Sequence, residues 1–318
     1  MRKSIMVPLD GSPFAEHAIR NAIGVARRLD QPLELVMAWE PKDIRTEMER
    51  RPISDPGPPG PERRYLNQVI ERLGPSVNAR ARVVRGAAGD ALVRHVAECG
   101  ASLIVMTTRG NGGVARAILG SVADRVVRDA PVPVLLIKPP PTEAQLGAER
   151  RFKRVIIALD GSEMSEEAVE PAIAVAGTDG VTYHLVRVIS GEADVPPDLG
   201  HQATSPDANE PVATNWPPRA QLERVAKRLR ARGIDVSTRV LIERDVAAAI
   251  TGFAYEIQAR LISMTTRARR GTSRAMLGSV ADTIMREAQC PVLLYYPVPG
   301  APAGIAERVH NTEVATSK

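Results

Sequence analysis

The sequence predicts an α/β protein built from two tandem domains, each an open, mostly parallel, doubly wound sheet. Three observations predict this architecture. The chain has 318 residues, enough for two domains of about 150 residues each. Two motifs recur: IMVPLDGS at 5–12 returns as VIIALDGS at 155–162, and LIVMTTR at 103–109 returns as LISMTTR at 261–267. In both copies short aliphatic runs alternate with helical patterns, which is typical of a parallel sheet with helices on both faces.

The first copy begins with an apolar strand at 5–9 that ends in Asp-Gly-Ser. A helix at 13–29 follows, because apolar residues recur at helical spacing and because Ser12 and Pro13 suit the N-cap and the first helical position. The later elements alternate in the same way, with strands expected at 33–39, 79–85, 102–107 and 133–138 and helices at 62–73, at 90–99 and from about residue 121.

The second copy repeats this order with an insertion, because its first motif is offset by 150 residues and its later motifs by 158. Its strands are expected at 155–159, 182–189, 235–242, 260–265 and 291–296, and its helices include 219–232 and 246–258. The Pro-rich segments at 52–62 and around 191–218 are expected to be loops.

A stretch rich in proline and polar residues at 139–150 marks the boundary between the copies. We therefore expect one domain at 1–140 and a second at 151–297. The remaining segment, 298–318, is rich in Pro, Ala and polar residues and is expected to be a flexible tail.

The composition excludes several classes of function. The chain is 44% hydrophobic, but no run approaches the ~20 apolar residues of a membrane span. The net charge of +5 is scattered, and aromatics make up only 3% of residues, so nucleic-acid binding is not favoured. Cys99 and Cys290 lie in different halves without a CxxC, which suits a reducing cytoplasm rather than a disulfide framework. The five histidines show no HxxxH spacing, so no resident metal site is expected; His17 and His95 are expected as ordinary helix residues, at the surface or partly buried.

Two motifs are expected to meet at one crevice. Asp10 ends the first strand, and Thr107–Gly113 ends the fourth, and ligands of open parallel sheets bind beyond the carboxyl ends of strands. The glycines of this loop allow the backbone N–H groups to approach phosphate oxygens. Gly120 and Ser121 stand where the last helix begins, with Ser121 expected as its cap and the helix N-terminus as an anion site. Asp10 would accept a ribose hydroxyl or bind Mg²⁺ carried by the phosphates.

Each of these features also has a purely structural explanation. Asp-Gly-Ser after a strand is a common turn, and Gly-Ser before a helix is a common cap. The Asp-Gly-Ser turn, the glycine-rich loop and the Gly-Ser pair occur together, at similar spacing, in both copies. This combination favours the ligand-binding interpretation over the structural one.

The motifs resemble those of the universal stress protein family, over nearly all of 1–140 and 151–297. The ATP-binding branch of that family carries G-x2-G-x9-G-[ST], which the first copy matches as Thr107-x2-Gly110-x9-Gly120-Ser121 and the second as Thr265-x2-Ala268-x9-Gly278-Ser279. The first motif glycine is threonine in both copies, and the second copy also loses the second glycine to Ala268. An alanine forced to positive φ costs about 1 kcal/mol, so the first copy is the better candidate for ATP.

The resemblance implies a Rossmann-like fold of the adenine nucleotide α-hydrolase type, with ATP and its Mg²⁺ as cofactors. The implied contacts in the first copy are Asp10, Ala38, Thr107, Gly110, Gly120, Ser121 and Val122. The weaker set in the second copy is Asp160, Val188, Thr265, Ala268, Gly278, Ser279 and Val280.

The resemblance also implies that the last strands, 131–137 and 290–296, pair with each other, so that one chain forms an intrachain pseudo-dimer. Further association into a homo-oligomer stays open.

Three functions compete. The leading one is a cytoplasmic stress-response regulator that binds ATP in the first domain and switches an unknown protein partner. The second is a dimerisation scaffold without nucleotide. The third is an enzyme of the wider adenine-binding α/β group, which ranks last because its SGGxDS-type and HxGH-type signatures are absent; slow ATP hydrolysis stays open.

Overall fold

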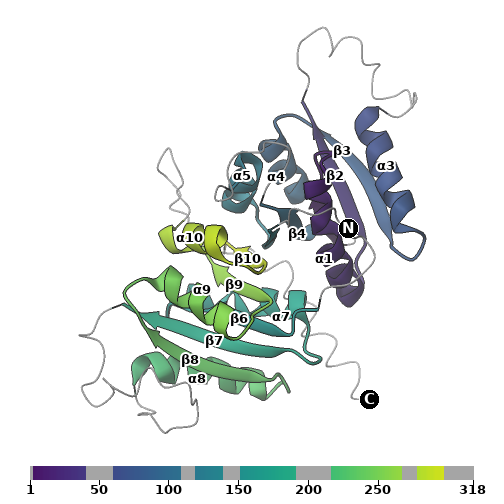
Figure 1. The fold of residues 1–318 in the computed structure, drawn as a ribbon. Coiled ribbons are helices and arrows are strands. Elements are labelled where there is room, and N and C mark those ends of the chain that lie inside the picture. The colour runs from purple at the N-terminus through teal and green to yellow at the C-terminus, as the bar shows by residue number, and fades with distance from the viewer. Residues whose placement is uncertain are drawn as a thin grey trace, which may run out of the picture. The chain divides into compact units, whose positions relative to one another are not determined.

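The structure is a computed structural model that describes residues 3–40, 60–108, 119–138, 151–190, 216–266 and 278–296 (Figure 1). Contacts divide the chain into two compact units, Met1–Arg150 and Arg151–Lys318. The predicted linker at 139–150, the tail and most of both Pro-rich segments lie outside the described residues. Each unit is described by itself below.

The first unit contains five parallel strands in the order β3-β2-β1-β4-β5. These are β1 (Ser4–Pro8), β2 (Leu33–Trp39), β3 (Ala79–Arg85), β4 (Ala101–Thr107) and β5 (Val134–Ile137). The register places Val7 beside Leu35 and Met106 beside Leu136. The strand order reverses at β1, between β2 and β4, which makes the carboxyl ends of β1 and β4 the topological switch point.

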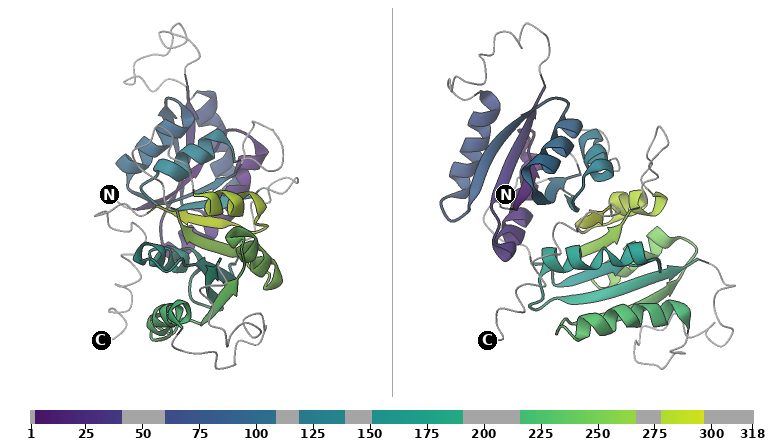
Figure 2. Two further views of the ribbon diagram at one scale, coloured as in Figure 1. Left: turned by 90° about the vertical axis from the view of Figure 1, so that its left-hand side faces the viewer. Right: turned by 180° about the vertical axis from the view of Figure 1, so that it is seen from behind.

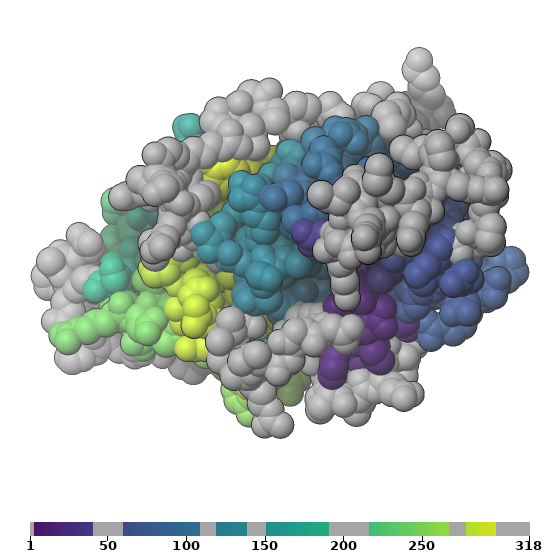
Figure 3. Space-filling view, turned by 90° about the horizontal axis from the view of Figure 1, so that it is seen from above, coloured from purple at the N-terminus to yellow at the C-terminus, as the bar shows by residue number. Residues whose placement is uncertain are grey.

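Two helices cover each face of this sheet. The helices α1 (Pro13–Leu29) and α3 (Pro61–Leu73) lie on one face, and α4 (Ala88–Cys99) and α5 (Ser121–Asp129) lie on the other (Figures 1 and 2). In the space-filling view the purple surface of α1 lies beside the blue surface of α3 (Figure 3). The strands between them are buried on both faces: all seven residues of β4 are buried. That pattern is expected of a parallel sheet in an α/β fold.

The second unit repeats the order as β10-β9-β6-β7-β8, again with parallel pairing. Its strands are β6 (Arg154–Ala158), β7 (Thr182–Ile189), β8 (Val236–Ile242), β9 (Leu261–Thr265) and β10 (Val292–Tyr295). Its helices are α6 (Glu163–Glu166), α7 (Val169–Ala176), α8 (Pro217–Arg230), α9 (Val246–Glu256) and α10 (Ser279–Glu287). The predicted fold class is therefore confirmed in both units.

The first helix differs between the copies. In the first unit α1 runs for 17 residues, whereas the second unit has a four-residue α6 and a separate α7. Pro171 explains the break, because its ring clashes with the carbonyl four residues earlier, and that residue, Glu167, is the C-cap of α6. The first copy has Asn21 at the corresponding position and stays helical.

Candidate functional site

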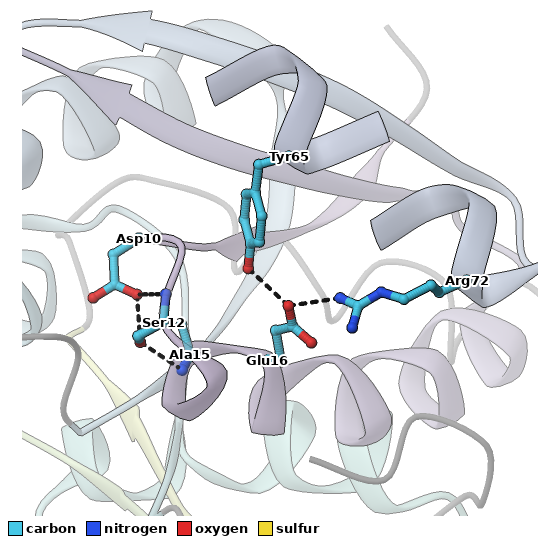
Figure 4. A network of polar contacts seen from close by, with 6 residues as sticks. All are labelled: Asp10, Ser12, Ala15, Glu16, Tyr65 and Arg72. Carbon is cyan, nitrogen blue, oxygen red and sulfur yellow. Dashed lines mark hydrogen bonds and ion pairs between the residues drawn. The ribbon is translucent and has the colours of Figure 1, made fainter. Parts of the chain in front are cut away.

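The Asp-Gly-Ser turn closes the carboxyl end of β1 (Figure 4). Oδ1 of the exposed Asp10 accepts hydrogen bonds from the backbone N–H of Ser12 at 3.0 Å and from its hydroxyl at 2.6 Å. The Ser12 hydroxyl in turn accepts the N–H of Ala15 at 3.2 Å, which caps α1 as predicted. Gly11 has φ of +83°, a conformation that favours glycine. One carboxylate oxygen of Asp10 is thus used by the turn, and in Figure 4 the other points away from it.

The second copy builds the same turn. Oδ1 of Asp160 accepts the N–H of Ser162 at 2.9 Å and its hydroxyl at 2.6 Å, and Gly161 has φ of +94°. The structural explanation of Asp-Gly-Ser is therefore confirmed for one oxygen in each copy.

The start of α5 lies beside the end of β4. The N–H of Gly120 donates to the carbonyl of Thr108 at 3.0 Å, and Thr107 is the last residue of β4, with 5% of its surface exposed. The prediction that Ser121 caps α5 is wrong, because Gly120 occupies the N-cap position and Ser121 is the first helical residue, exposed. Among the described residues no side chain caps α5. The first N–H groups of an uncapped helix are the groups that bind anions in proteins.

Glycine at 120 is not required by the described fold. Its φ of −64° and ψ of 149° suit any residue. A Cβ built there would lie 3.5 Å from the Thr108 carbonyl, which is an ordinary contact. In the second unit Gly278 is similar, with φ of −57°, and no atom of the described residues lies within 4 Å of a Cβ built there.

The structure brings most of the predicted first-copy residues to one end of one sheet. Asp10 follows β1, and Thr107 is the last residue of β4. The N–H of Gly120 donates to the carbonyl of Thr108, the residue that follows Thr107. Ala38 lies in β2 on the other side of β1, where the N–H of Leu9 donates to the carbonyl of Val36 at 2.8 Å. Val122 follows in the first turn of α5, half-buried. Gly110 and Ala268 lie outside the described residues.

The corresponding positions of the second copy occupy the same places in its own sheet. Asp160 follows β6, Val188 lies in β7, and Thr265 ends β9. Gly278 is the N-cap of α10, with Ser279 and Val280 in its first turn.

The side chains that pack over the Asp-Gly-Ser turn differ between the copies, and this difference was not predicted from the sequence. In the second unit Arg187 and Gln221 lie over Gly161: Nη1 of Arg187 donates to Oε1 of Gln221 at 2.5 Å, and the Gln221 amide donates to the Gly161 carbonyl. A Cβ at Gly161 would lie 2.7 Å from Arg187. In the first unit the atom nearest a Cβ at Gly11 is Cε of Met37, at 3.8 Å.

A groove of about 640 Å³ lies between α1 and α3 and is lined by Glu16, Tyr65, Gln68, Glu71 and Arg72. Oε1 of Glu16 accepts the Tyr65 hydroxyl at 3.0 Å and the Arg72 guanidinium at 2.6 Å (Figure 4). Burial and the Glu16 charge raise the pKa of Tyr65, so its hydroxyl stays protonated. With two carboxylates in its wall, this groove does not suit phosphates and is not the predicted site.

A second group of polar residues in the first unit, Glu34, His95 and Cys99, is buried between β2 and α4. His95 lies in a helix as expected, but the expectation that it is at the surface or partly buried is wrong, because 6% of it is exposed and Nε2 lies 3.5 Å from the Glu34 carboxylate. Hydrogen bonding to Cys99 and then to Glu34 raises the pKa of His95 to about 9 against the effect of burial. Burial raises the pKa of Glu34, but His95 and Arg80 outweigh it and the pKa lies below its usual value. The sequence signal was the four-residue spacing of His95 and Cys99.

No helix among the described residues is long and apolar enough to cross a membrane.

Comparison with known proteins identifies the fold and the relatives. The sequence matches the universal stress protein family over residues 1–138 and again over 151–295. A universal stress protein of Mycobacterium tuberculosis is 28% identical over 310 residues, which cover 91% of this chain and 95% of the relative. The crystal structure of a universal stress protein from Archaeoglobus fulgidus is similar at a TM-score of 0.61 and 20% identity, covering 92% of this chain and 98% of that one.

A shorter solved structure, a universal stress protein in complex with cAMP, covers 47% of this chain and 100% of its own, with 20% identity and a TM-score of 0.35.

Proposed function

The chain belongs to the universal stress protein family, and on that premise we propose that its first domain binds ATP with Mg²⁺ and that the bound nucleotide controls a protein partner in a stress response. The observation that supports this proposal most strongly is the presence of glycine at position 120. Neither its backbone angles nor its neighbours require glycine, and it stands at the uncapped N-terminus of α5 beside the switch point. A ligand that approaches the backbone closely at this position would explain the glycine, because any side chain would stand in its way.

Each first-domain residue has a role in this proposal. The N–H groups of Ser121 and Val122 bind phosphate oxygens. Gly120, whose own N–H donates to the Thr108 carbonyl, lets the phosphates approach the start of the helix, and the loop from Thr107 through Gly110 wraps around them. The backbone of Ala38 contacts the adenine ring. Asp10 accepts a ribose hydroxyl or binds Mg²⁺, because one of its oxygens points away from the turn (Figure 4).

The second domain is the weaker site. The corresponding residues are Asp160, Val188, Thr265, Ala268, Gly278, Ser279 and Val280. The Arg187 side chain comes within 2.7 Å of a Cβ built at Gly161, whereas the nearest described atom at Gly11, Cε of Met37, lies at 3.8 Å, so the approach to the turn is narrower in the second domain. We therefore propose one ATP for each chain.

A scaffold without nucleotide is the second candidate, and two observations favour it. Thr107 is buried where the family motif has glycine, and the Asp10 turn satisfies its own hydrogen bonds without a ligand. The described residues place no nucleophile or histidine base beside the proposed phosphates, so we propose at most slow ATP hydrolysis.

Two further proposals concern the setting. Both cysteines are buried and neither forms a disulfide, which suits the reducing cytoplasm. The last strands β5 and β10 are buried apolar runs, and we propose that they pair with each other within the chain, which would leave neither as a bare sheet edge.

The test is to purify the chain, denature it and quantify released nucleotide by chromatography. The proposal predicts about one ATP for each chain and none from Gly120→Asp, whose carboxylate would repel the phosphates. Gly278→Asp is the matched control and should still release ATP. If the native chain releases no nucleotide and binds none on titration with Mg-ATP, the scaffold becomes the better account.

A further inference from the structure

The buried group of Glu34, His95 and Cys99 lies away from the candidate nucleotide site. Glu34 is the second residue of β2, at the amino end of the strand, whereas Asp10 and Thr107 mark carboxyl ends. The exposed fractions of Glu34, His95 and Cys99 are 4%, 6% and 6%. His95 and Cys99 are four residues apart on α4, so their side chains share the helix face that packs against the sheet.

The three side chains offer metal-ligating atoms that all lie within 4.8 Å of one another. Nε2 of His95 is 3.5 Å from Oε1 of Glu34. Two buried atoms of this group, Nε2 of His95 and Oε2 of Glu34, have no hydrogen-bond partner. Nε2 of His95 faces Oε1 of Glu34, whereas the lone pairs of Oε2 meet no donor among the described residues; since buried polar atoms are rarely left in this condition, Oε2 points to a bound cation. A metal ion would displace the proton of His95.

We propose that Glu34, His95 and Cys99 form a Zn²⁺ site, with a carboxylate oxygen, an imidazole nitrogen and a thiolate as ligands. Mixed sulfur, nitrogen and oxygen donors are the set that zinc binds in proteins. Bond lengths of about 2.0–2.3 Å place the ligand atoms of a tetrahedral site about 3.5 Å apart. Nε2 of His95 lies 3.5 Å from Oε1, so the Glu34 carboxylate is within reach of a shared metal ion, and the widest pair of ligand atoms must close by about 1 Å.

The surroundings support the carboxylate as a ligand. Nε of Arg80 lies 3.3 Å from Oε1 of Glu34, and its side chain is half exposed. Arg80 therefore orients one carboxylate oxygen while Oε2 stays unpartnered, the arrangement of an outer contact that steers a metal ligand. Besides its interaction with His95, the Cys99 thiol donates a weak 3.9 Å hydrogen bond to the carbonyl of Val96 in its own helix, which a metal would replace. Three protein ligands leave a fourth position for a small molecule such as water.

The second unit provides an internal comparison. Strand registers and the shared repeat place His184, Phe253 and Ile257 where the first unit has Glu34, His95 and Cys99. The rings of His184 and Phe253 meet edge to face with centroids 6.0 Å apart. This trio has one ligating side chain instead of three, so the proposal assigns zinc to the first domain alone.

The test uses Co²⁺ as a spectroscopic probe for zinc in the full-length chain without an affinity tag. One equivalent of Co²⁺ should produce a thiolate-to-cobalt charge-transfer absorption, and Zn²⁺ should displace it. Cys290→Ala is the matched control and should keep the absorption, whereas Cys99→Ala should lose it. The double variant His95→Phe, Cys99→Ile installs the residues of the second unit and should lose both the absorption and any zinc-dependent rise in melting temperature.

Circular dichroism establishes that each variant is folded. Glu34→Gln keeps both the thiol and the side-chain size, and it should weaken Co²⁺ binding at least about tenfold, so it tests the site should Cys99→Ala fail to fold. The proposal is overturned if the native chain gives no charge-transfer absorption. It is equally overturned if the double variant binds metal as tightly as the native chain, because surface groups would then account for the binding.

Discussion

Replacing Gly120 with serine separates a structural role for this glycine from a ligand-binding role. The backbone at Gly120, with φ of −64° and ψ of 149°, is close to that of Ser12, the serine that caps α1 at −85° and 147°. A serine there would therefore cap α5 as Ser12 caps α1. Within the described part of the chain its Cβ would meet the Thr108 carbonyl, at 3.5 Å.

The magnitude follows from two favourable terms. Serine is a better N-cap than glycine by a few tenths of a kcal/mol. Removing a glycine from a backbone conformation that other residues also adopt adds about 0.4–1 kcal/mol by restricting the unfolded chain. Gly120→Ser should therefore stabilise the first domain by about 1 kcal/mol, which corresponds to about 2–4 °C for a unit of this size.

The same change should weaken ATP binding. The new hydroxyl would accept the helix N–H that a phosphate oxygen needs and would occupy the space where the phosphate approaches. We expect at least a tenfold loss of affinity, about 1.4 kcal/mol, measured by calorimetric titration with Mg-ATP alongside thermal unfolding. Gly278→Ser is the control, since it caps α10 in the same way without touching the proposed site. The reasoning fails if Gly120→Ser destabilises the protein, or if it binds ATP as tightly as the native chain.

Three further predictions concern stability. Gly161→Ala should lower the free energy of unfolding, measured by chemical denaturation, more than Gly11→Ala does. Both changes put alanine at positive φ, which costs about 1 kcal/mol, but the new Cβ at 161 would also lie 2.7 Å from Arg187. Equal losses of stability would contradict the close packing of Arg187 on Gly161. Glu16→Gln should lower the free energy of unfolding by about 1 kcal/mol, because Tyr65 and Arg72 both donate to this carboxylate. Glu166→Gln removes the corresponding ion pair of the second unit, with the more exposed Arg228, and should lower the free energy of unfolding less. The reverse order would refute this account. Burial lowers the pKa of His184, so the unfolded chain takes up a proton at this site at higher pH than the folded chain does, and the free energy of unfolding should fall as pH drops through about 6.5. Denaturation curves of His184→Gln should lack that decline. If the free energy of unfolding of the variant depends on pH as in the native chain, His184 is not its source.

Local sequence signals predicted most of the fold. Aliphatic runs located the strands, and Ser12 with Pro13 located the start of α1, because a cap and a fixed φ act over a few residues. The break between α6 and α7 was also readable from Pro171 but was not predicted. Ser121 was assigned as a cap one residue too late, because a Gly-Ser pair before a helix does not show which of its members adopts the extended backbone.

Contacts between distant segments could not be predicted in the same way. The four-residue spacing of His95 and Cys99 is visible in the sequence, but Glu34 is 61 residues before His95, and only the packing of α4 on β2 brings it within 3.5 Å. The cover of Arg187 and Gln221 over Gly161 likewise depends on how α8 lies on β7. Pairing of β5 with β10 stays a prediction.

The central claim is that the first domain holds one ATP at the start of α5. Its most direct test is a calorimetric titration of the nucleotide-free, full-length chain with Mg-ATP, with Gly120→Asp and Gly278→Asp measured in parallel. The account predicts one site for each chain, lost in Gly120→Asp and kept in Gly278→Asp. Absence of binding in the native chain, or loss of binding in Gly278→Asp with Gly120→Asp unaffected, would contradict it.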